Sequence, residues 1–325
     1  QLMKLISQIL TAAMAWSVSI GVAIAADWPD GRPITMVVPF PTGSGTDSVA
    51  RIFAREIGQR LDTTVVVDNK PGANGVIAGQ FVTRSKPDGY TILISTNTPL
   101  SAAPWLNKNV SYDVKTDFTP IARGGNLPFI LIANASRPYN SVKELIDYAQ
   151  ENHGKVTYAS GNSTGIVAGA TLSQRANIDI LHVPYRGTPQ AITDLIGGQV
   201  DFMFTDFTSG MPFVSSGQVK AFAVSTAEQS TLLPDLPSME QAGVDDFDIT
   251  SWNGFLGPAK MDSSVVKILN STINEIVSDT QVKADLAKLG FDAFSGSQEE
   301  FAEFVVEQYE LWGDLIKAAG ISAQD

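Results

Sequence analysis

Strand-like and helix-like runs alternate along almost the whole chain, and this alternation restricts the fold more than any other feature of the sequence. Short apolar runs rich in Val, Ile and Phe are followed by longer runs whose apolar residues recur at helical spacing. Such alternation is typical of parallel strands that are covered by helices. The fold class that we predict is therefore α/β with mixed, mostly parallel sheets, and with ligand sites beyond the carboxyl ends of the strands.

The first of these units, residues 34–61, is a strand that breaks into a Gly/Ser/Thr loop and opens onto an amphipathic helix. The backbone of loop 42–45 can approach a ligand closely, and the first N–H groups of the helix point toward it. A carboxylate or a phosphate is the expected guest. Nucleotides are disfavoured, because Ser48 stands at the third glycine position of G-x-G-x-x-G and no Walker-type Lys follows. On its own, the unit is equally consistent with a plain connector.

The N-terminal residues resemble a targeting segment. Lys4, an apolar stretch and an Ala-rich end are typical of a cleaved secretory signal, which we assign to residues 1–26. Its removal lowers the 22 basic residues to 21 against 34 acidic ones, a net charge of −13. This charge disfavours nucleic acid and anionic membranes as partners. The chain has no Cys to carry a lipid or form a disulfide, so we expect a free protein in the periplasm.

The mature length also bears on domain organisation. About 300 residues exceed a comfortable single core, so we expect two domains. Several strands end in turns rich in Gly, Ser, Thr or Asn, which are the candidate binding loops: 40–47, 69–75, 96–101, 160–165 and 205–209.

Five stretches in register resemble one family, the Bug-type substrate-binding proteins of tripartite tricarboxylate transporters. They are VPFPTGSGTD (38–47), VDNKPGANG (67–75), PDGYTIL (87–93), VPYRGTPQAITDLIGGQVDFMF (183–204) and LPDLPSMEQAG (233–243). The resemblance implies a two-lobe periplasmic binding protein of the type II kind, whose lobes are joined by two crossover strands near 123–129 and 221–226. Lobe 1 would comprise residues 27–125 plus 226–325, and lobe 2 residues 126–225.

The same resemblance implies capture of a small carboxylate, without a cofactor or a metal, by a monomer. The partners would be the membrane components of the transporter, or alternatively a sensor kinase that reads the same pocket. The implied ligand-binding positions are Phe40, Thr42, Gly43, Ser44, Gly45, Thr46, Asn74, Thr96 and Asn97 in lobe 1, and Ser160, Asn162, Ser163, Thr164, Thr205 and Asp206 in lobe 2.

The sequence departs from the family pattern at positions that bear on the ligand. Residues 41–44 read PTGS where PPGG is common, and the loop 159–167 is shorter than in many relatives. Thr205 stands where an Asp often follows the Met-Phe pair, which removes a partner for a ligand amine. We therefore expect a di- or tricarboxylate without an amine, aromatic ones included. Whether Tyr185, Arg186 and Trp252 face the cleft stays open at this point.

An exported serine hydrolase is the alternative function, because residues 161–165 read G-N-S-T-G between a strand and a helix. Such an enzyme needs an acid and then a His downstream of Ser163. His153 precedes Ser163, and His182 lies within the next strand, which leaves no room for an intervening acid. We therefore predict a binding protein and not an enzyme. The acidic turn 245–248 is interpreted as solvated and not as a metal site.

Overall fold

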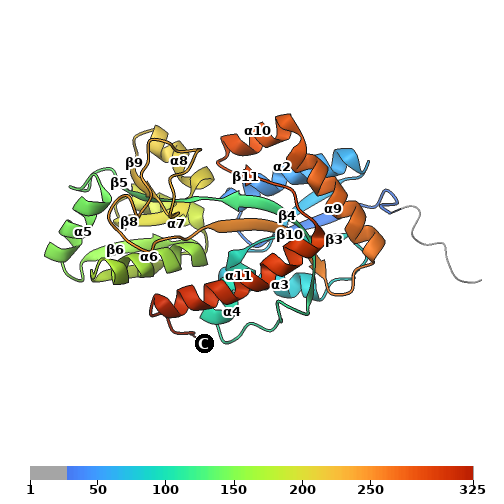
Figure 1. The fold of residues 1–325 in the computed structure, drawn as a ribbon, viewed down its shortest axis with the longest axis horizontal. Coiled ribbons are helices and arrows are strands. Elements are labelled where there is room, and N and C mark those ends of the chain that lie inside the picture. Colours follow the sequence, from blue (N-terminus) through green and yellow to red (C-terminus); the bar gives the residue numbers. More distant parts are fainter. Residues whose placement is uncertain (1–27, 325) are drawn as a thin grey trace, which may run out of the picture.

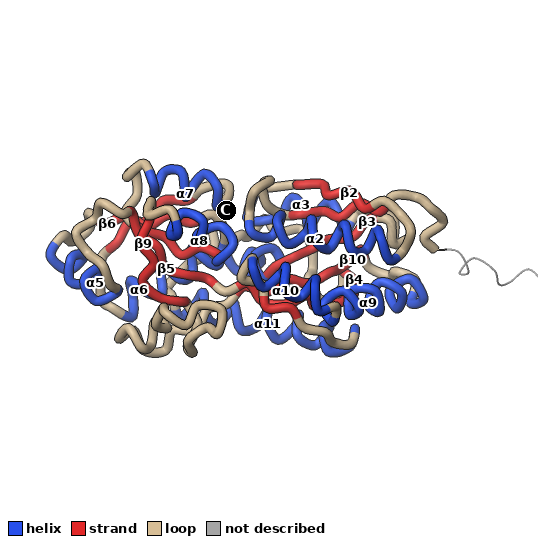
Figure 2. The backbone as a smooth tube through the Cα atoms, turned by 90° about the horizontal axis from the view of Figure 1, so that it is seen from above, coloured by secondary structure: helices blue, strands red, loops and turns tan. Residues whose placement is uncertain are grey.

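The computed structural model describes residues 28–324, so the predicted signal peptide lies outside the described residues. Two β-sheets, each flanked by helices, lie side by side along the long axis of the molecule (Figure 1). The view from above shows the same separation, with extended chain passing between the two halves (Figure 2). We call the half that contains the N-terminal strand lobe 1 and the other half lobe 2.

The sheet of lobe 1 has six strands in the order β11-β4-β10-β3-β1-β2. Their bounds are β1 (Ile34–Val38), β2 (Val65–Asn69), β3 (Thr91–Thr96), β4 (Phe118–Leu127), β10 (Ser251–Pro258) and β11 (Asp292–Ala293). Strand β1 pairs in parallel with β2 and β3, whereas β10 and β11 run antiparallel to their partners. Strand β1 is covered on both faces, since Ile34 and Met36 pack into one core and Val37 into another.

The helices of lobe 1 cover both faces of this sheet (Figure 1). They are α2 (Gly45–Arg60), α3 (Val76–Thr83), α4 (Ala103–Leu106), α9 (Ser263–Ser278), α10 (Thr280–Lys288) and α11 (Gln298–Ala318), with the short turns η1 (Ala73–Gly75) and η2 (Thr98–Ala102). Helix α11 reaches both lobes, because Phe301 packs into a core of lobe 1 and Trp312 into a core of lobe 2.

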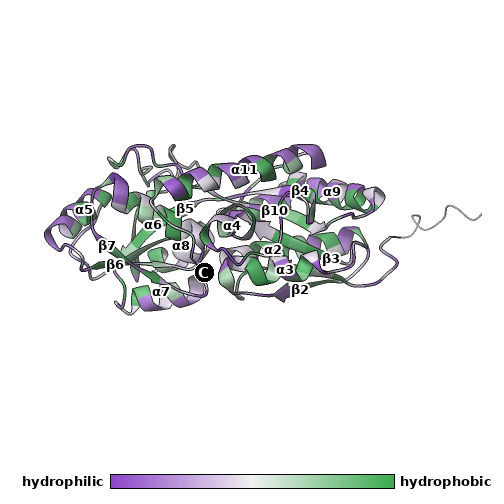
Figure 3. Ribbon diagram, turned by 90° about the horizontal axis from the view of Figure 1, so that it is seen from below, coloured by the Kyte–Doolittle hydropathy of each residue, from purple (hydrophilic) through white to green (hydrophobic). Residues whose placement is uncertain are grey.

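The sheet of lobe 2 has five strands in the order β7-β6-β8-β5-β9. The strands are β5 (Phe129–Asn134), β6 (Val156–Ser160), β7 (Ile180–Pro184), β8 (Phe202–Asp206) and β9 (Val219–Val224), and the helices are α5 (Val142–Glu151), α6 (Ser163–Arg175), α7 (Thr188–Ile196) and α8 (Phe207–Ser215). Apolar residues gather on the strands and the sheet-facing sides of these helices, whereas their outer faces are hydrophilic (Figure 3).

The predicted α/β class is confirmed, but parallel pairing is less extensive than expected. Parallel pairs join β1, β2 and β3 in lobe 1, and β6, β7 and β8 in lobe 2. The remaining pairs are antiparallel, and all of them involve β4, β5, β9, β10 or β11. Strands β5 and β10 each begin where the chain enters a sheet from the other lobe, at the carboxyl ends of its parallel strands, so they run antiparallel to β8 and β3.

The chain crosses between the lobes twice. The first crossing, from β4 into β5, falls where the sequence predicted it. The second does not: residues 221–224 belong to β9, and the chain returns to the first sheet only at Ser251. The intervening segment packs on lobe 2, with Met239 and Phe247 in its core and the Ile249 amide bonded to the Ser225 carbonyl. Burial of these apolar residues holds the segment on lobe 2 beyond the predicted crossing.

Candidate functional site

The loops that follow β1, β3, β6 and β8 meet between the two lobes. Each begins a helix or a helical turn, and the helix starts are capped by their own side chains. Ser44 accepts a hydrogen bond from the Asp47 amide (3.2 Å) at the start of α2. Asn162 accepts one from the Gly165 amide (3.0 Å) at the start of α6. These caps are the local reason why Gly/Ser/Thr/Asn-rich turns stop the strands where they do.

A small cavity of about 20 Å³, here called the inner cavity, lies between these helix starts. Its volume is close to that of a single water site. It is lined by Phe40, Ser44, Gly45, Thr46, Thr96, Thr98, Leu127, Phe129, Asn162, Thr164, Thr188, Asp206 and Ser251. Eight of these are positions predicted from the sequence, and no Lys or Arg is among them. The polar groups of this lining are therefore side-chain hydroxyls, a side-chain amide, backbone groups and one carboxyl group.

Four helices begin at the inner cavity, because its lining includes residues at the N-termini of α2, α6, α7 and α8. The first turns of α6 and α7 contain no acidic residue. The first turn of α2 contains Asp47, whose carboxylate is hydrogen-bonded to Arg51 and Asn69. The unpaired N–H groups of these first turns give the cavity a positive potential without a basic side chain.

Asp206 is the one ionisable residue of the inner cavity, and it is 4% exposed. Its carboxylate caps α8 by accepting hydrogen bonds from the amide (2.8 Å) and the hydroxyl (3.0 Å) of Ser209. Burial raises the pKa of this carboxyl above its usual value, and the bonds from Ser209 offset only part of that rise. A carboxyl in this position is more readily neutral than a surface Asp.

Asn97 links the two lobes at the floor of the cleft. Its Nδ2 donates to Oγ1 of Thr164 in lobe 2 over 2.8 Å, and its Oδ1 accepts from the hydroxyl of Ser251 over 2.7 Å. Ser251 is the residue at which the chain returns to lobe 1. All three side chains are buried. Asn97 therefore joins the end of β3, the start of α6 and one connecting strand.

Two of the predicted positions have a buried hydroxyl without a hydrogen-bond partner in the described part of the chain, and neither residue lines the inner or the outer cavity. The Oγ of Ser163 and the Oγ1 of Thr205 both belong to residues that are fully buried. Unpartnered buried hydroxyls are unusual, and an ordered water is the usual partner of such a group. Ser163 also lacks the His contact that a nucleophilic Ser requires.

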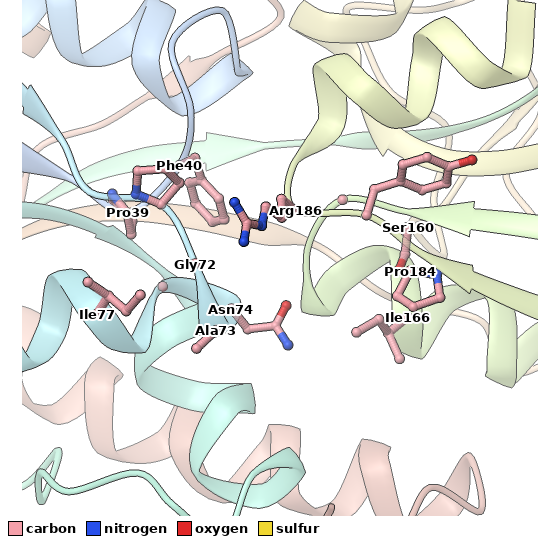
Figure 4. A pocket seen from close by; sticks show the side chains of 14 residues that line it. Pro39, Phe40, Gly72, Ala73, Asn74, Ile77, Ser160, Ile166, Pro184 and Arg186 are labelled. Atoms are coloured by element: carbon pink, nitrogen blue, oxygen red, sulfur yellow. The ribbon is translucent and has the colours of Figure 1, made fainter.

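A larger cavity of about 550 Å³, here called the outer cavity, continues the cleft toward solvent and shares Phe40 with the inner cavity. Figure 4 shows the side chains that line it. Lobe 1 contributes Pro39, Phe40 and residues 71–75 with Ile77, and lobe 2 contributes residues 160–161, Ile166 and residues 184–186. Its walls are mainly apolar, and its one charged lining residue is Arg186.

The lobe 1 wall of the outer cavity has an unusual backbone. Residues 72–75 all have positive φ, with values of 47° at Ala73 and 52° at Asn74. Non-glycine residues rarely adopt this conformation, and it costs on the order of 1 kcal/mol or more for each residue. Strain of this kind is found where a loop has to present particular groups to a ligand. Here it places Asn74 at the cavity wall.

Sequence reasoning missed a contact between Ser160 and His182. Oγ of Ser160 lies 2.6 Å from Nε2 of His182, whose ring stacks on Tyr158 with centroids 4.9 Å apart. Desolvation lowers the pKa of His182 below its usual value. The contact follows from the parallel pairing of β6 with β7, which sets Tyr158 opposite His182. The sequence could have indicated this contact only if the register between the strands 156–160 and 180–184 had been predicted.

The remaining predicted positions lie at different depths. Thr42 and Gly43 are exposed, and they contact Asn69 and Asp47 within lobe 1 instead of lining either cavity. Trp252 is core, packed against Phe301 at a centroid distance of 6.0 Å. Tyr185 and Arg186 line the outer cavity, as do Asn74 and Ser160. Thr188, at the start of α7, was not among the predicted positions.

No group of three or more His, Asp or Glu within residues 28–324 is arranged to hold a metal ion. The same residues contain no helix with the length and apolar character needed to cross a membrane.

Comparisons with known proteins agree on one family. A family model described as the tripartite tricarboxylate transporter family receptor matches residues 49–321. A protein from the tcbD-tcbE intergenic region of Pseudomonas sp. strain P51 is 36% identical over 94% of this chain and 91% of its own length. The structure of R. palustris Rpa4515 with adipate has a TM-score of 0.89 at 29% identity, covering 92% of this chain and all of that one. The periplasmic binding protein BugD has a TM-score of 0.85 at 36% identity, covering 90% of this chain and 99% of its own.

Proposed function

Because the chain belongs to the tripartite tricarboxylate transporter receptor family, a family of binding proteins and not of enzymes, we propose that it captures a di- or tricarboxylate in the periplasm. One carboxylate of the ligand binds at the inner cavity, whose volume takes one of its oxygens, and the rest of the ligand extends into the outer cavity. The loaded protein delivers the ligand to the membrane components of a tripartite tricarboxylate transporter.

The observation that carries this proposal is the convergence of four helix N-termini on the inner cavity. Helix N-termini bind anions through free N–H groups and the helix dipole. A local site of this kind explains how a protein with many more acidic than basic residues attracts an anion. The hydroxyls of Ser44 and Thr164 supply further donors around the same space.

The strength of such a site is adequate. A hydrogen bond to a charged group contributes about 1.5–3 kcal/mol. Three or four of them, plus apolar contact in the outer cavity, exceed the roughly 8 kcal/mol of a micromolar complex and leave a surplus for ordering costs. A basic side chain in the inner cavity is therefore not required.

Release to a transporter requires the lobes to part. We propose that lobes 1 and 2 move about the two connecting segments, at residues 127–129 and 249–251. The ligand favours the closed form because its carboxylate contacts helix starts from both lobes. The Asn97–Thr164 hydrogen bond forms only when the lobes meet, so it adds to the same preference.

The chemistry of a relative supports a dicarboxylate. R. palustris Rpa4515, whose fold matches over nearly the whole chain, holds adipate. In this chain the inner cavity has room for only one small polar group, and the outer cavity is large and mainly apolar. A dicarboxylate fits these two cavities if one of its carboxylates binds at the inner cavity and the rest of the molecule lies in the outer cavity.

A thermal-shift screen of carboxylates tests the proposal. A ligand at about 100-fold over its Kd adds about 2.7 kcal/mol to the free energy of unfolding, which raises Tm by several degrees. We expect dicarboxylates to raise Tm in the wild type and to raise it less in Thr164→Val. The control is Thr193→Val, whose hydroxyl bonds only the Pro189 carbonyl on the surface of α7. A chain that responds to no carboxylate contradicts the proposal.

A further inference from the structure

Arg186 is the one charged residue among the described residues that line the outer cavity, and its exposed side chain has no partner within residues 28–324. Its guanidinium makes no side-chain hydrogen bond, ion pair or cation–π contact within residues 28–324. Within residues 28–324 most other Arg residues, such as Arg51 and Arg60, pair with carboxylates, whereas Arg84 and Arg123 do not. An Arg that faces a cavity without a partner is available to an anionic ligand.

Asn74 lies on the opposite wall, and its side chain has no partner among the described residues either. Figure 4 shows the Asn74 carboxamide and the Arg186 guanidinium projecting into the same cavity from the two lobes. Asn74 is held there by the backbone of residues 72–75, in which every φ is positive. The two side chains together provide a charge and amide donors for an oxygen anion.

The other side chains that line the outer cavity are largely apolar. Lobe 1 supplies Pro39, Phe40 and Ile77, and lobe 2 supplies Ile166 and Pro184. The cavity volume of about 550 Å³ exceeds what a second carboxylate alone would fill. The space therefore suits a hydrocarbon spacer that joins two anionic groups.

We propose that Arg186 and Asn74 form a second anion site in the outer cavity, which binds the far carboxylate of a dicarboxylate whose hydrocarbon spacer packs on Phe40, Ile77 and Ile166. This inference rests on the proposed function and specifies its ligand class. The inner site binds any carboxylate end, whereas the outer site selects ligands that are charged at both ends. Each methylene that the walls bury strengthens binding by about fourfold until the second carboxylate reaches Arg186.

Calorimetric titration with two matched series tests the inference. One series consists of α,ω-dicarboxylates from four to ten carbons, and the other of monocarboxylates of the same lengths. Arg186→Gln is expected to weaken the best dicarboxylate by about tenfold to hundredfold. The monocarboxylate of equal length should change by less than about twofold. Arg186→Lys should keep part of the preference for dicarboxylates over monocarboxylates. Asn74→Ala, like Arg186→Gln, should weaken the binding of dicarboxylates more than that of monocarboxylates.

Arg175→Gln is the matched control, because Arg175 lies in the same lobe at the far end of α6 and pairs on the surface with Asp246. It should leave both series unchanged. The inference is overturned if Arg186→Gln weakens both series equally or neither. A different result would contradict the proposed function: the wild type would then bind no carboxylate of either series. In that case this inference would fall as well.

Discussion

Gly45 at the start of α2 and Asp206 at the start of α8 touch across the cleft: a Cβ built on Gly45 would lie 2.1 Å from Oδ1 of Asp206. The Asp206 carboxylate cannot easily move away, because Ser209 holds both of its oxygens. Gly187 stands in a similar relationship, with its Cβ position 2.4 Å from Cγ of Pro41 in the other lobe. The lobes meet where there is no side chain to keep them apart.

Gly45→Ala should therefore oppose closure without harming either lobe. Overpacking of a tight contact costs about 1–3 kcal/mol, so the carboxylate affinity should fall roughly fivefold to hundredfold. Calorimetry measures the affinity, and small-angle scattering should show a more extended particle. The control is Gly197→Ala, whose Cβ would lie at an ordinary 3.4 Å from its nearest neighbour. Equal affinity in both variants would show that this contact does not limit closure.

The hydrogen bond between Asn97 and Thr164 should contribute to the closed form. Thr164→Val removes the acceptor and leaves the buried Nδ2 of Asn97 unpaired, at a cost of about 1–3 kcal/mol. A double-mutant cycle with Asn97→Ala, read as ligand affinity, should give a coupling energy of at least about 0.5 kcal/mol. Additive effects of the two substitutions would mean that the contact is absent from the liganded protein.

Asp206 should make stability depend on pH. Burial raises its pKa in the folded protein above the ordinary 3.8. Between these two pKa values the folded state binds more protons than the unfolded state, so this residue's contribution to stability falls as pH rises. Asp206→Asn keeps the cap of α8 and does not titrate. The variant should therefore be more stable at neutral pH, which a higher Tm would show.

This gain should shrink as pH falls toward 4, and a gain that grows on acidification would contradict the assignment. Asp206→Asn should also bind anions more tightly near pH 7, since it removes a negative charge from the inner cavity.

His182 should titrate below its ordinary value of 6.5, because desolvation beside Tyr158 lowers its pKa. The folded state then binds fewer protons than the unfolded state as pH drops through 6.5, so the protein loses stability on that side. NMR titration of the imidazole, assigned with His182→Gln, measures the midpoint. A midpoint at or above 6.5 would contradict the effect of desolvation.

The fold class could be predicted because strands and helices are determined largely by residues close together in the sequence, and their order indicates the class. Alternating runs located nearly all the strands and helices, and glycine- and hydroxyl-rich turns located the loops that line the inner cavity. The extent of parallel pairing was overestimated, since the sequence pattern of a strand does not reveal which way its partner runs. The second crossing was displaced because Met239 and Phe247 pack on lobe 2, a tertiary contact without a local signal.

The site was predicted only in part for a similar reason. Ser44, Asn162 and Thr164 lie in loops that the sequence marks. Thr188 was not predicted, because Gly187 and Pro189 indicate a helix start but do not reveal that this helix start faces the cleft. Whether Arg186 faces the cleft depends on how lobe 2 meets lobe 1. That arrangement involves residues distant in sequence, so pattern alone left it open.

The location of a bound carboxylate tests the central claim most directly. A crystal structure with the carboxylate that most raises Tm should show one carboxylate group within hydrogen-bonding distance of backbone amides at the starts of α6 and α7, with Thr164 or Ser44 as a further donor. A carboxylate bound only in the outer cavity, or away from the cleft between the lobes, would contradict the account.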